Sequence, residues 1–401
     1  MAIQTTSNLT NAVGTRYTTA YQQAADMMRI YDQHALSVDA PQNQLETRKG
    51  LGTTYTFHFV SDMTPGSTAI SETADVIAQI LRDATSTIST TSRGELLKWS
   101  QLLDLQAYTN IIAERSQILG RNWMETVDNQ ARNACLQGNL FVRAAARASL
   151  DAGTAGNTLT SSSFHQAATK AQLLRCPTMV NAQGEKRGLS IAHTDVFYDM
   201  INSNNILSVA LYQDKEILFN GEIGQFAGFK IVASPWAKIF LGAGAANASS
   251  ASTTLNGAVN ALATTLIVAS ATNDEVGRSL MVGTVETGNT HYDTNEAVVY
   301  SSGTTTVTFT GTASNGGLRF DHASGETVNN KDNVYPVTFG SNASIVKAWA
   351  TETGEYGELV GPETSGDLKQ WQQMGYKWYG GYGRPAENWI LRGEYSSALQ
   401  A

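Results

Sequence analysis

The first 44 residues combine one amphipathic stripe with polar flanks. Aromatic and aliphatic side chains recur at spacings of four, three, four and three residues, which predicts a short helix. These residues are Tyr17, Tyr21, Ala24, Met28 and Tyr31. The flanking segments are rich in Thr, Asn and Gln and offer no core of their own. We therefore predict an N-terminal arm over residues 1–44 that lies on another surface.

Strand-type alternation begins in the next region, residues 45–95. It is clearest at 53–60, and a second strand rich in Thr, Ser and Ile follows at 84–92, with a helical pattern at 71–83 between them. The aromatic residues that share one side of the first strand are Tyr55, Phe57 and Phe59. Because an isolated pair of strands is marginally stable in water, this extended β-ribbon should also lie against a partner surface.

A helical period of 3.6 replaces the alternation from Asp104 to Gly138. The apolar positions that share one helix face are Leu105, Tyr108, Ile112, Leu119, Trp123, Val127, Ala131 and Ala134. No proline interrupts the segment, and Gly138 suits the end of a helix. The pattern predicts a spine helix of roughly 50 Å.

The rest of the chain divides by pattern into three parts. Residues 96–245 surround the spine helix with further helices and short strands, which predicts a mixed α/β region. Residues 246–335 contain only short strands at turn-rich spacing, which predicts an inserted all-β domain, either an Ig-like sandwich or a small barrel. Two strands return in residues 336–401, so the predicted fold class is α+β. The apolar faces of those two strands carry Tyr376 and Trp378 on the first, and Trp389, Leu391 and Tyr395 on the second.

The flanks of the insert should lie close together. Domain insertion is tolerated where the two ends of a surface loop already meet. We therefore expect residues 239–245 to lie beside residues 334–340, so that the surrounding fold continues across the insert.

Charged residues are scarce in this chain. Asp, Glu, Lys and Arg make up 15% of it, against roughly 25% in typical soluble domains. Because the cores of protein interfaces are depleted in charge, this composition favours a chain that contacts neighbours over much of its surface. The net charge of −8 does not suit a sequence-reading DNA-binding protein, which carries a basic stripe.

The negative charge is concentrated in the insert. Residues 246–330 contain seven acidic and two basic residues, so this stretch holds −5 of the −8. Cys135 and Cys176 are the only cysteines, which predicts neither a disulfide framework nor a zinc site. The N-terminal segment lacks the features of a secretory signal, and no apolar run is long enough for a transmembrane helix. We expect the chain to be made in a cytoplasm and to remain there until it is released.

No sequence motif of an enzyme stands out. Walker, HExxH and GxSxG patterns are absent, and two glycine-rich stretches are incomplete as dinucleotide loops. His193 with Asp195 and His291 with Asp293 form HxD pairs, but neither has a third metal ligand nearby in sequence. Surface or helix-capping roles suit these pairs better. We predict no catalytic residues, no cofactor and no metal site.

The order of these elements resembles that of the major capsid proteins of tailed double-stranded-DNA bacteriophages, which have the Hong Kong 97-type fold. Residues 48–59 (RKGLGTTYTFHF) look like the start of that family's extended loop. Residues 221–235 (GEIGQFAGFKIVASP) look like its glycine-rich strand segment in the axial domain. Residues 366–397 (GDLKQWQQMGYKWYGGYGRPAENWILRGEYSS) look like the end of its peripheral domain. The resemblance covers residues 1–245 and 336–401 and departs from the family at the insert.

This resemblance implies a structural protein that self-assembles as pentamers and hexamers into an icosahedral phage head around double-stranded DNA. The implied location is the virion, after assembly in the bacterial cytoplasm, with portal, scaffolding and decoration proteins as further partners and no membrane. Because packed DNA is a polyanion, the acidic insert should face outward. The arm and ribbon should reach over neighbouring subunits. The residues that we assign to this assembly interface are Tyr17, Tyr21, Met28, Tyr31, Arg48, Lys49, Tyr55, Phe57 and Phe59.

Two other interpretations remain open. Bacterial encapsulin compartments share the shell fold and are not viral. A β-rich adhesin or glycan-binding module would make the insert the functional part. Glycan binding is also open as a secondary role for the insert of a capsid protein, with Tyr292, Tyr300 and Phe320 as candidate contacts. The spine helix and the α/β region disfavour this second alternative.

Overall fold

The structure of the chain is a computed structural model. It describes residues 44–46, 54–60, 63, 65, 80, 82–106, 111–152, 154, 156–176, 179–180, 186–202, 222–246, 252–270, 276–277, 279–286, 290–341, 344–349 and 358–400. These residues form two compact units. Unit 1 contains the described residues up to Met124 together with Ile345–Ala386, and unit 2 contains Glu125–Ser344 and the residues from Glu387 onward.

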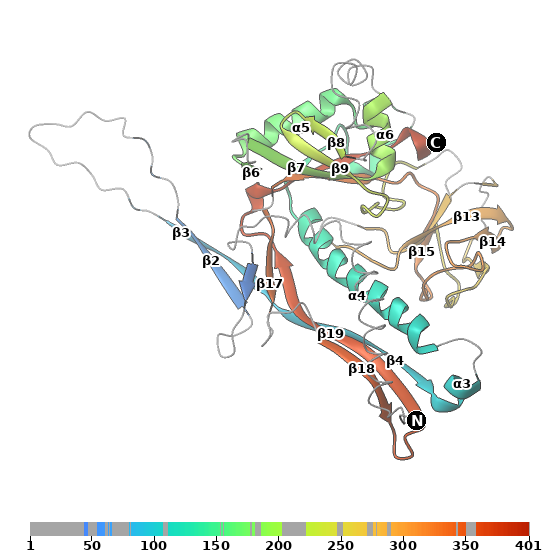
Figure 1. The fold of residues 1–401 in the computed structure, drawn as a ribbon. Helices are drawn as coiled ribbons and strands as arrows, with labels where there is room; N and C mark the ends of the chain where they lie inside the picture. The colour runs from blue at the N-terminus through green and yellow to red at the C-terminus, as the bar shows by residue number, and fades with distance from the viewer. Residues whose placement is uncertain are drawn as a thin grey trace, which may run out of the picture. The chain divides into compact units, whose positions relative to one another are not determined.

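Unit 1 is built on a five-stranded sheet around one long strand. Its strands are β1 (Gln44–Glu46), β4 (Thr91–Ser100), β17 (Val346–Trp349), β18 (Glu358–Ser365) and β19 (Trp371–Gly383). The sheet order is β1-β17-β19-β18, and β4 pairs with β19 over its whole length, from Trp371↔Ser100 to Gly380↔Thr91. Figure 1 shows β4, β18 and β19 side by side. Strand β4, in the first quarter of the chain, thus pairs with β19, which lies close to the C-terminus in sequence.

A separate two-stranded ribbon lies between β1 and β4 in the sequence. β2 (Thr54–Val60) and β3 (Asp83–Ser89) pair antiparallel, from Thr54↔Ser89 to Val60↔Asp83. The strand pairing expected from the alternation is therefore present. The helix expected at 71–83 lies mostly outside the described residues, and Asp83 belongs to β3.

Two helices occupy the region of the predicted spine helix, α3 (Gln101–Gln106) and α4 (Ile111–Leu136). Leu119, Trp123 and Val127 in α4 are buried as predicted. Leu105 was predicted to share their face, but it lies in α3, which buries none of its residues, and is 77% exposed. With 26 residues, α4 is roughly 39 Å long, which is shorter than predicted. Just after α4 ends, Gly138 has a φ of 110°, a conformation that favours glycine.

Unit 2 contains a seven-stranded sheet with helices on one face. Its strands are β5 (Phe141–Val142), β6 (Met179–Val180), β7 (Lys186–Ala192), β8 (Glu222–Phe226), β9 (Phe229–Ala233), β16 (Tyr335–Gly340) and β20 (Leu391–Tyr395). Their order is β5-β20-β16-β7-β9-β8, with β6 on β7. Two helices, α5 (Ser161–Leu173) and α6 (Thr194–Asn202), pack on this sheet (Figure 1). Phe164 of α5 lies against Phe229 and Phe339 of the sheet, with ring centroids 6.2 and 5.0 Å away.

The described part of unit 2 also contains the 3-10 turns η2 (Arg147–Ser149), η4 (Glu387–Trp389) and η5 (Ala398–Gln400). Trp389 lies in η4 and not in a strand, which corrects its predicted place on the face of the second returning strand. Leu391 and Tyr395 lie in β20 and are buried.

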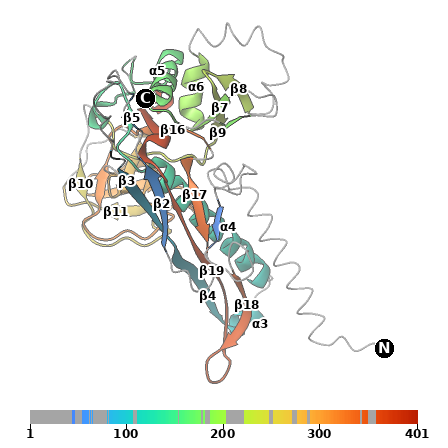
Figure 2. The same cartoon turned by 90° about the vertical axis from the view of Figure 1, so that its left-hand side faces the viewer.

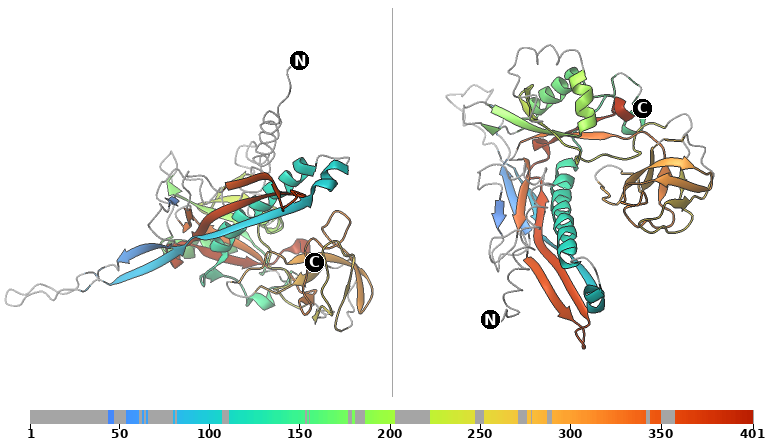
Figure 3. Two further views of the ribbon diagram at one scale, coloured as in Figure 1. Left: turned by 90° about the horizontal axis from the view of Figure 1, so that it is seen from below. Right: turned by 45° about the vertical axis from the view of Figure 1, so that its right-hand side comes forward.

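A six-stranded sheet in unit 2 closes on itself as a small barrel (residues 252–330). Its strands are β10 (Thr253–Thr254), β11 (Thr265–Ile267), β12 (Ser279–Gly283), β13 (Glu296–Ser302), β14 (Thr306–Thr310) and β15 (Thr327–Asn329), in the order β10-β15-β12-β13-β14-β11. The two edges meet through an antiparallel bridge between Leu255 and Val268 and a hydrogen bond of 2.8 Å from the Asn256 N–H to the Ile267 carbonyl. Figure 2 and Figure 3 show these strands arranged around a common interior.

The barrel has a core of its own. Its buried members are Leu255, Leu266, Val268, Leu280, Val282, Val298, Tyr300, Val307, Phe309, Leu318 and Val328. The large sheet of unit 2 and its two helices bury a different set of residues.

The flanks of the barrel lie side by side, as expected from the sequence. Phe240 and Val334 exchange backbone hydrogen bonds of 2.8 and 3.0 Å. Further along, the Gly244 N–H donates to the Asp332 carbonyl at 2.7 Å, and the Asp332 N–H donates to the Ala245 carbonyl at 3.0 Å. The chain therefore enters and leaves the barrel at one place.

Candidate assembly region

Most of the residues predicted to form the assembly interface lie outside the described part of the chain. These are Tyr17, Tyr21, Met28, Tyr31, Arg48 and Lys49. Tyr55, Phe57 and Phe59 belong to β2, and of these three side chains the structure describes Phe57. It is half-buried and packs against Ile88, Val346 and Ala348 of its own chain. The structure thus places Phe57 in a contact within unit 1, and the interface role of all nine residues stays a prediction.

The ladder formed by β4 and β19 has one buried face. Trp99, Tyr376 and Trp378 are each at most 3% exposed. The first half of α4 covers this face: the Tyr376 hydroxyl donates to Asn122 Oδ1 at 2.7 Å, and the Arg115 guanidinium lies 5.0 Å from the Trp99 ring. In unit 1 the first half of α4 therefore packs as a layer on the sheet.

Apolar side chains are exposed where this ladder meets α3. The start of α3 is joined to Gln370, the residue before β19, by a hydrogen bond of 2.8 Å from the Gln101 N–H to the Gln370 carbonyl. Six large apolar residues of β4, of α3 and of the segment 368–371 are between 43% and 77% exposed: Leu96, Leu102, Leu103, Leu105, Leu368 and Trp371. Exposed apolar patches of this kind typically mark a contact surface. We refer to these six residues as the apolar end of unit 1.

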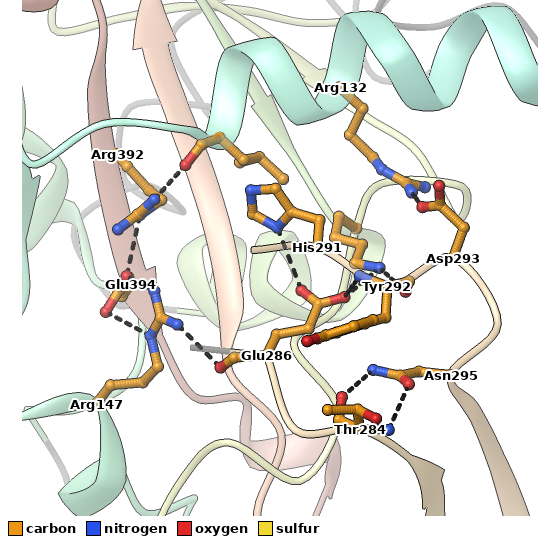
Figure 4. Close-up of polar contacts among 12 residues, drawn as sticks. Arg132, Arg147, Thr284, Glu286, His291, Tyr292, Asp293, Asn295, Arg392 and Glu394 are labelled. Carbon is orange, nitrogen blue, oxygen red and sulfur yellow. Dashed lines mark hydrogen bonds and ion pairs between the residues drawn. The ribbon is translucent and has the colours of Figure 1, made fainter. Parts of the chain in front are cut away.

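A buried polar cluster joins the barrel to the rest of unit 2 (Figure 4). Glu286, between β12 and β13, has a side chain 1% exposed, and its Oε1 lies 2.5 Å from Nζ of Lys238. Lys238 also donates to the Tyr292 carbonyl at 2.8 Å, and the Tyr292 N–H donates to Glu286 at 3.1 Å. Burial alone would raise the pKa of Glu286, but hydrogen bonds from His291 and Lys238 hold it below its usual value. The cluster therefore contains an ionised carboxylate.

Two further ion pairs link the barrel to the second half of α4. Arg132 pairs with Asp293 (Figure 4), and Arg319 Nη2 lies 2.6 Å from Glu125 Oε2. Arg132 and Glu125 belong to α4, whereas Asp293 and Arg319 belong to the barrel. Within unit 2 the barrel is therefore connected to the rest of the unit by ion pairs as well as by the two chain segments that flank it.

Glu394 in β20 is surrounded by three arginines. Its side chain is fully buried and contacts Arg143 Nη1 at 3.2 Å, Arg392 Nε at 3.0 Å and both Nε and Nη2 of Arg147. Arg147 also donates to the Glu286 carbonyl at 3.3 Å, which connects this group to the polar cluster (Figure 4). Burial would raise the pKa of Glu394, but Arg147 and the other two guanidinium groups hold it below its usual value.

These contacts change the meaning of the acidic count in residues 246–330. Glu286 pairs with Lys238, Asp293 with Arg132, and Glu296 and Glu326 with His322. Asp321 accepts a hydrogen bond from the Ala261 N–H at 2.6 Å. Five of the seven acidic residues are thus engaged inside unit 2. The formal charge of −5 overstates the charge that the barrel presents to solvent, which weakens the charge argument for an outward-facing barrel.

The two HxD pairs have structural partners. His193 accepts a hydrogen bond from the Asp195 N–H at 3.2 Å at the start of α6, as expected for a capping role. His291 was predicted to be at the surface or at a cap, but its side chain is 2% exposed, stacks on Phe240 and contacts Glu286. The described part of the chain holds no group of three or more His, Cys, Asp or Glu side chains that could hold a metal ion.

The candidate glycan residues do not form one exposed set. Tyr300 is 6% exposed, belongs to the barrel core and donates its hydroxyl to the Gly303 carbonyl. It is therefore not accessible to a glycan, which corrects that expectation. Tyr292 and Phe320 are half-buried.

Among the residues that the structure describes, no helix is long and apolar enough to cross a bilayer.

Sequence comparisons find no relative. No known protein-family profile matches the chain, and no curated protein matches its sequence. The solved structures do match. The capsid of Ralstonia phage GP4 aligns with a TM-score of 0.50 and 10% identity over 90% of this chain and 86% of the other.

Two other structures agree with this match. The capsid asymmetric unit of cyanophage Pam1 gives a TM-score of 0.51 and 11% identity over 87% of this chain and 86% of the other. The capsid of Helicobacter pylori bacteriophage KHP30 gives 0.50 and 8% over 90% and 89%. The resemblance identified from the sequence is therefore confirmed at the level of the fold: this chain folds like the capsid proteins of tailed double-stranded-DNA phages.

Proposed function

We propose that the chain is the major capsid protein of a tailed double-stranded-DNA phage. Its copies assemble as pentamers and hexamers into an icosahedral head that encloses the genome without reading its sequence. The observation that carries this proposal is the shared fold, which extends over 87–90% of this chain and 86–89% of the phage capsid chains. The protein is structural, acts in the virion, and is assembled in the bacterial cytoplasm, where portal, scaffolding and decoration proteins are its further partners.

The surface of unit 1 supports an assembling subunit. Its apolar end exposes six large apolar residues that a monomer would leave in water. The ribbon of β2 and β3 is a pair of strands of the kind that is marginally stable by itself. We assign both features to contacts between copies. The barrel, which has its own core, is a domain inserted into the shell fold and carried on the head's outer face.

Electron microscopy of the purified chain, together with sedimentation velocity, tests the assembly. We expect rings or closed shells. A stable 43.0 kDa monomer over a wide concentration range would contradict the proposal.

A pair of matched variants tests the surface. Leu105→Glu places a charge in the apolar end at a residue that is 77% exposed, so it should prevent assembly without unfolding the subunit. Ile267→Glu is the control, because Ile267 is 50% exposed on the outside of the barrel. Equal assembly of both variants would show that the apolar end is not a subunit contact.

A further inference from the structure

His322 lies in the barrel between two carboxylates, and its side chain has no exposed surface. Its Nε2 is 2.9 Å from Glu296 Oε1, and its Nδ1 is 2.7 Å from Glu326 Oε2. A neutral imidazole has one N–H and can donate to one of these carboxylates, whereas the protonated ring donates to both. The geometry therefore fits the imidazolium form.

The same two carboxylates hold the backbone around His322. Glu296 accepts the N–H groups of Arg319 at 2.8 Å and Phe320 at 3.1 Å. Glu326 accepts the N–H of Ala323 at 3.1 Å. Residues 319–326 are therefore organised by two glutamates whose mutual repulsion is offset by the charge of one histidine.

This segment also carries a link between the barrel and α4. Arg319 donates its backbone N–H to Glu296, and its guanidinium lies 2.6 Å from Glu125 of α4. A change in the backbone of residues 319–326 thus changes the position of the group that reaches α4.

Two further residues next to His322 have partners of their own. Asp321 points to the Ala261 N–H at 2.6 Å. Val259, on the facing segment, meets His322 through two backbone hydrogen bonds of 2.9 and 2.8 Å. Burial would lower the pKa of His322, but hydrogen bonds and charges of Glu296 and Glu326 outweigh burial and raise it.

We propose that His322, Glu296 and Glu326 form a proton-dependent latch that fixes residues 319–326, and with them the Arg319–Glu125 link, while His322 is protonated. Loss of the ring proton leaves the buried carboxylate of Glu296 and the partly exposed carboxylate of Glu326 without a cation between them and releases the segment. A histidine with a raised folded-state pKa stabilises fully below its unfolded value of about 6.5 and loses that contribution as the pH rises through the folded value. The latch therefore holds in acid and opens in alkali, and this does not depend on assembly into a shell.

Hydrogen–deuterium exchange of the full chain between pH 5.5 and 9.5, corrected for intrinsic exchange, tests the latch. Peptides covering residues 318–328 should lose protection by about tenfold for each pH unit by which the folded pKa exceeds the unfolded one. Peptides covering β12 should not change. His322→Gln should remove this pH dependence, whereas His165→Gln, at an exposed position of α5, should leave it intact. The same pH dependence in His322→Gln as in the unmodified chain would overturn the proposal.

A second measurement keeps the test decisive if His322→Gln does not fold. Exchange of the imidazole C2 hydrogen reports the titration of His322 directly in the unmodified chain. Its midpoint should lie above about 6.5, and Glu326→Gln, a change at a side chain 25% exposed, should move it to lower pH. A midpoint at or below 6.5 would refute the latch.

Discussion

Replacing Glu394 by Gln should cost unit 2 a large part of its stability. The carboxylate is fully buried and is the counter-ion of Arg143, Arg147 and Arg392. Gln keeps the shape and one acceptor oxygen but removes the negative charge. Three guanidinium groups would then remain close together without the carboxylate that all three contact.

The size of the effect follows from the burial of this group. Removing one partner of a buried ion pair costs about 3–5 kcal/mol, because the remaining charge has lost its solvent and its counter-ion. A domain is stabilised by only about 5–15 kcal/mol in total. With a urea dependence of about 2 kcal/mol per molar, the unfolding midpoint should fall by roughly 2 M.

Urea unfolding of the unassembled subunit, followed by circular dichroism and tryptophan fluorescence, measures this change. Glu363→Gln is the matched control, because Glu363 is exposed in β18 and surface substitutions usually change stability by less than about 0.5 kcal/mol. Since the pKa of Glu394 is held below its usual value, its contribution is present above about pH 4.3 and is lost as the pH falls through the folded value. Glu394→Gln should therefore lose less stability on acidification than the unmodified chain. Equal midpoints for Glu394→Gln and Glu363→Gln at pH 7 would falsify the reasoning.

Three further predictions concern the ladder, the barrel and the ribbon. Gly94→Ala should destabilise unit 1 by about 1–3 kcal/mol, because a Cβ there would lie 2.4 Å from the Tyr376 carbonyl oxygen; Gly361→Ala, where a Cβ meets nothing within 4 Å, is the control in urea unfolding. Lys238→Met should lower the unfolding midpoint of the full chain, because it leaves Glu286 buried without its cation. In a chain whose residues 247–331 are replaced by about four Gly/Ser residues, Glu286 is absent, so the same substitution should raise the unfolding midpoint. Effects of the same sign in both backgrounds would show that Glu286 is not the partner that matters. Replacing residues 53–92 by a Gly/Ser linker should stop shell formation in electron micrographs and preserve the circular-dichroism signal of α4; normal shells would exclude the ribbon from assembly.

The local elements of this fold were predictable because each strand or helix repeats its own pattern. Val298 and Tyr300 alternate with more exposed residues in β13, and Val307 and Phe309 do so in β14. The same alternation could have excluded Tyr300 as a glycan contact, because it has the parity of the buried Val298. The choice between a sandwich and a barrel was not predictable, since closure depends on the Leu255–Val268 bridge beside strands of two and three residues, which are too short for a pattern.

The buried polar clusters were harder to predict from the sequence than the strands and helices. Arg392 and Glu394 are charges between Leu391 and Tyr395, the apolar residues of β20, and charges that are buried together in this way are usually paired. Lys238 and Glu286 are 48 positions apart and have no pattern in common, so only the tertiary structure joins them. The formal charge of residues 246–330 overstated their exposed charge for the same reason, because a count of acidic residues does not show which of them are paired internally.

The pairing of β4 with β19 has a consequence for the order of events during synthesis. A ribosome adds about 5–20 residues per second, so Trp371 emerges at least about ten seconds after Ser100, its partner in the ladder. β5 waits similarly for β20, whereas all six strands of the barrel lie within residues 253–329 and can pair as soon as they emerge. Contacts between distant residues also form slowly, because the loop between them must first be closed. The barrel should therefore fold while the chain is still on the ribosome, and the β4–β19 ladder should be completed only at the end of translation. A nascent chain would then present its assembly surface only after the whole subunit has been made.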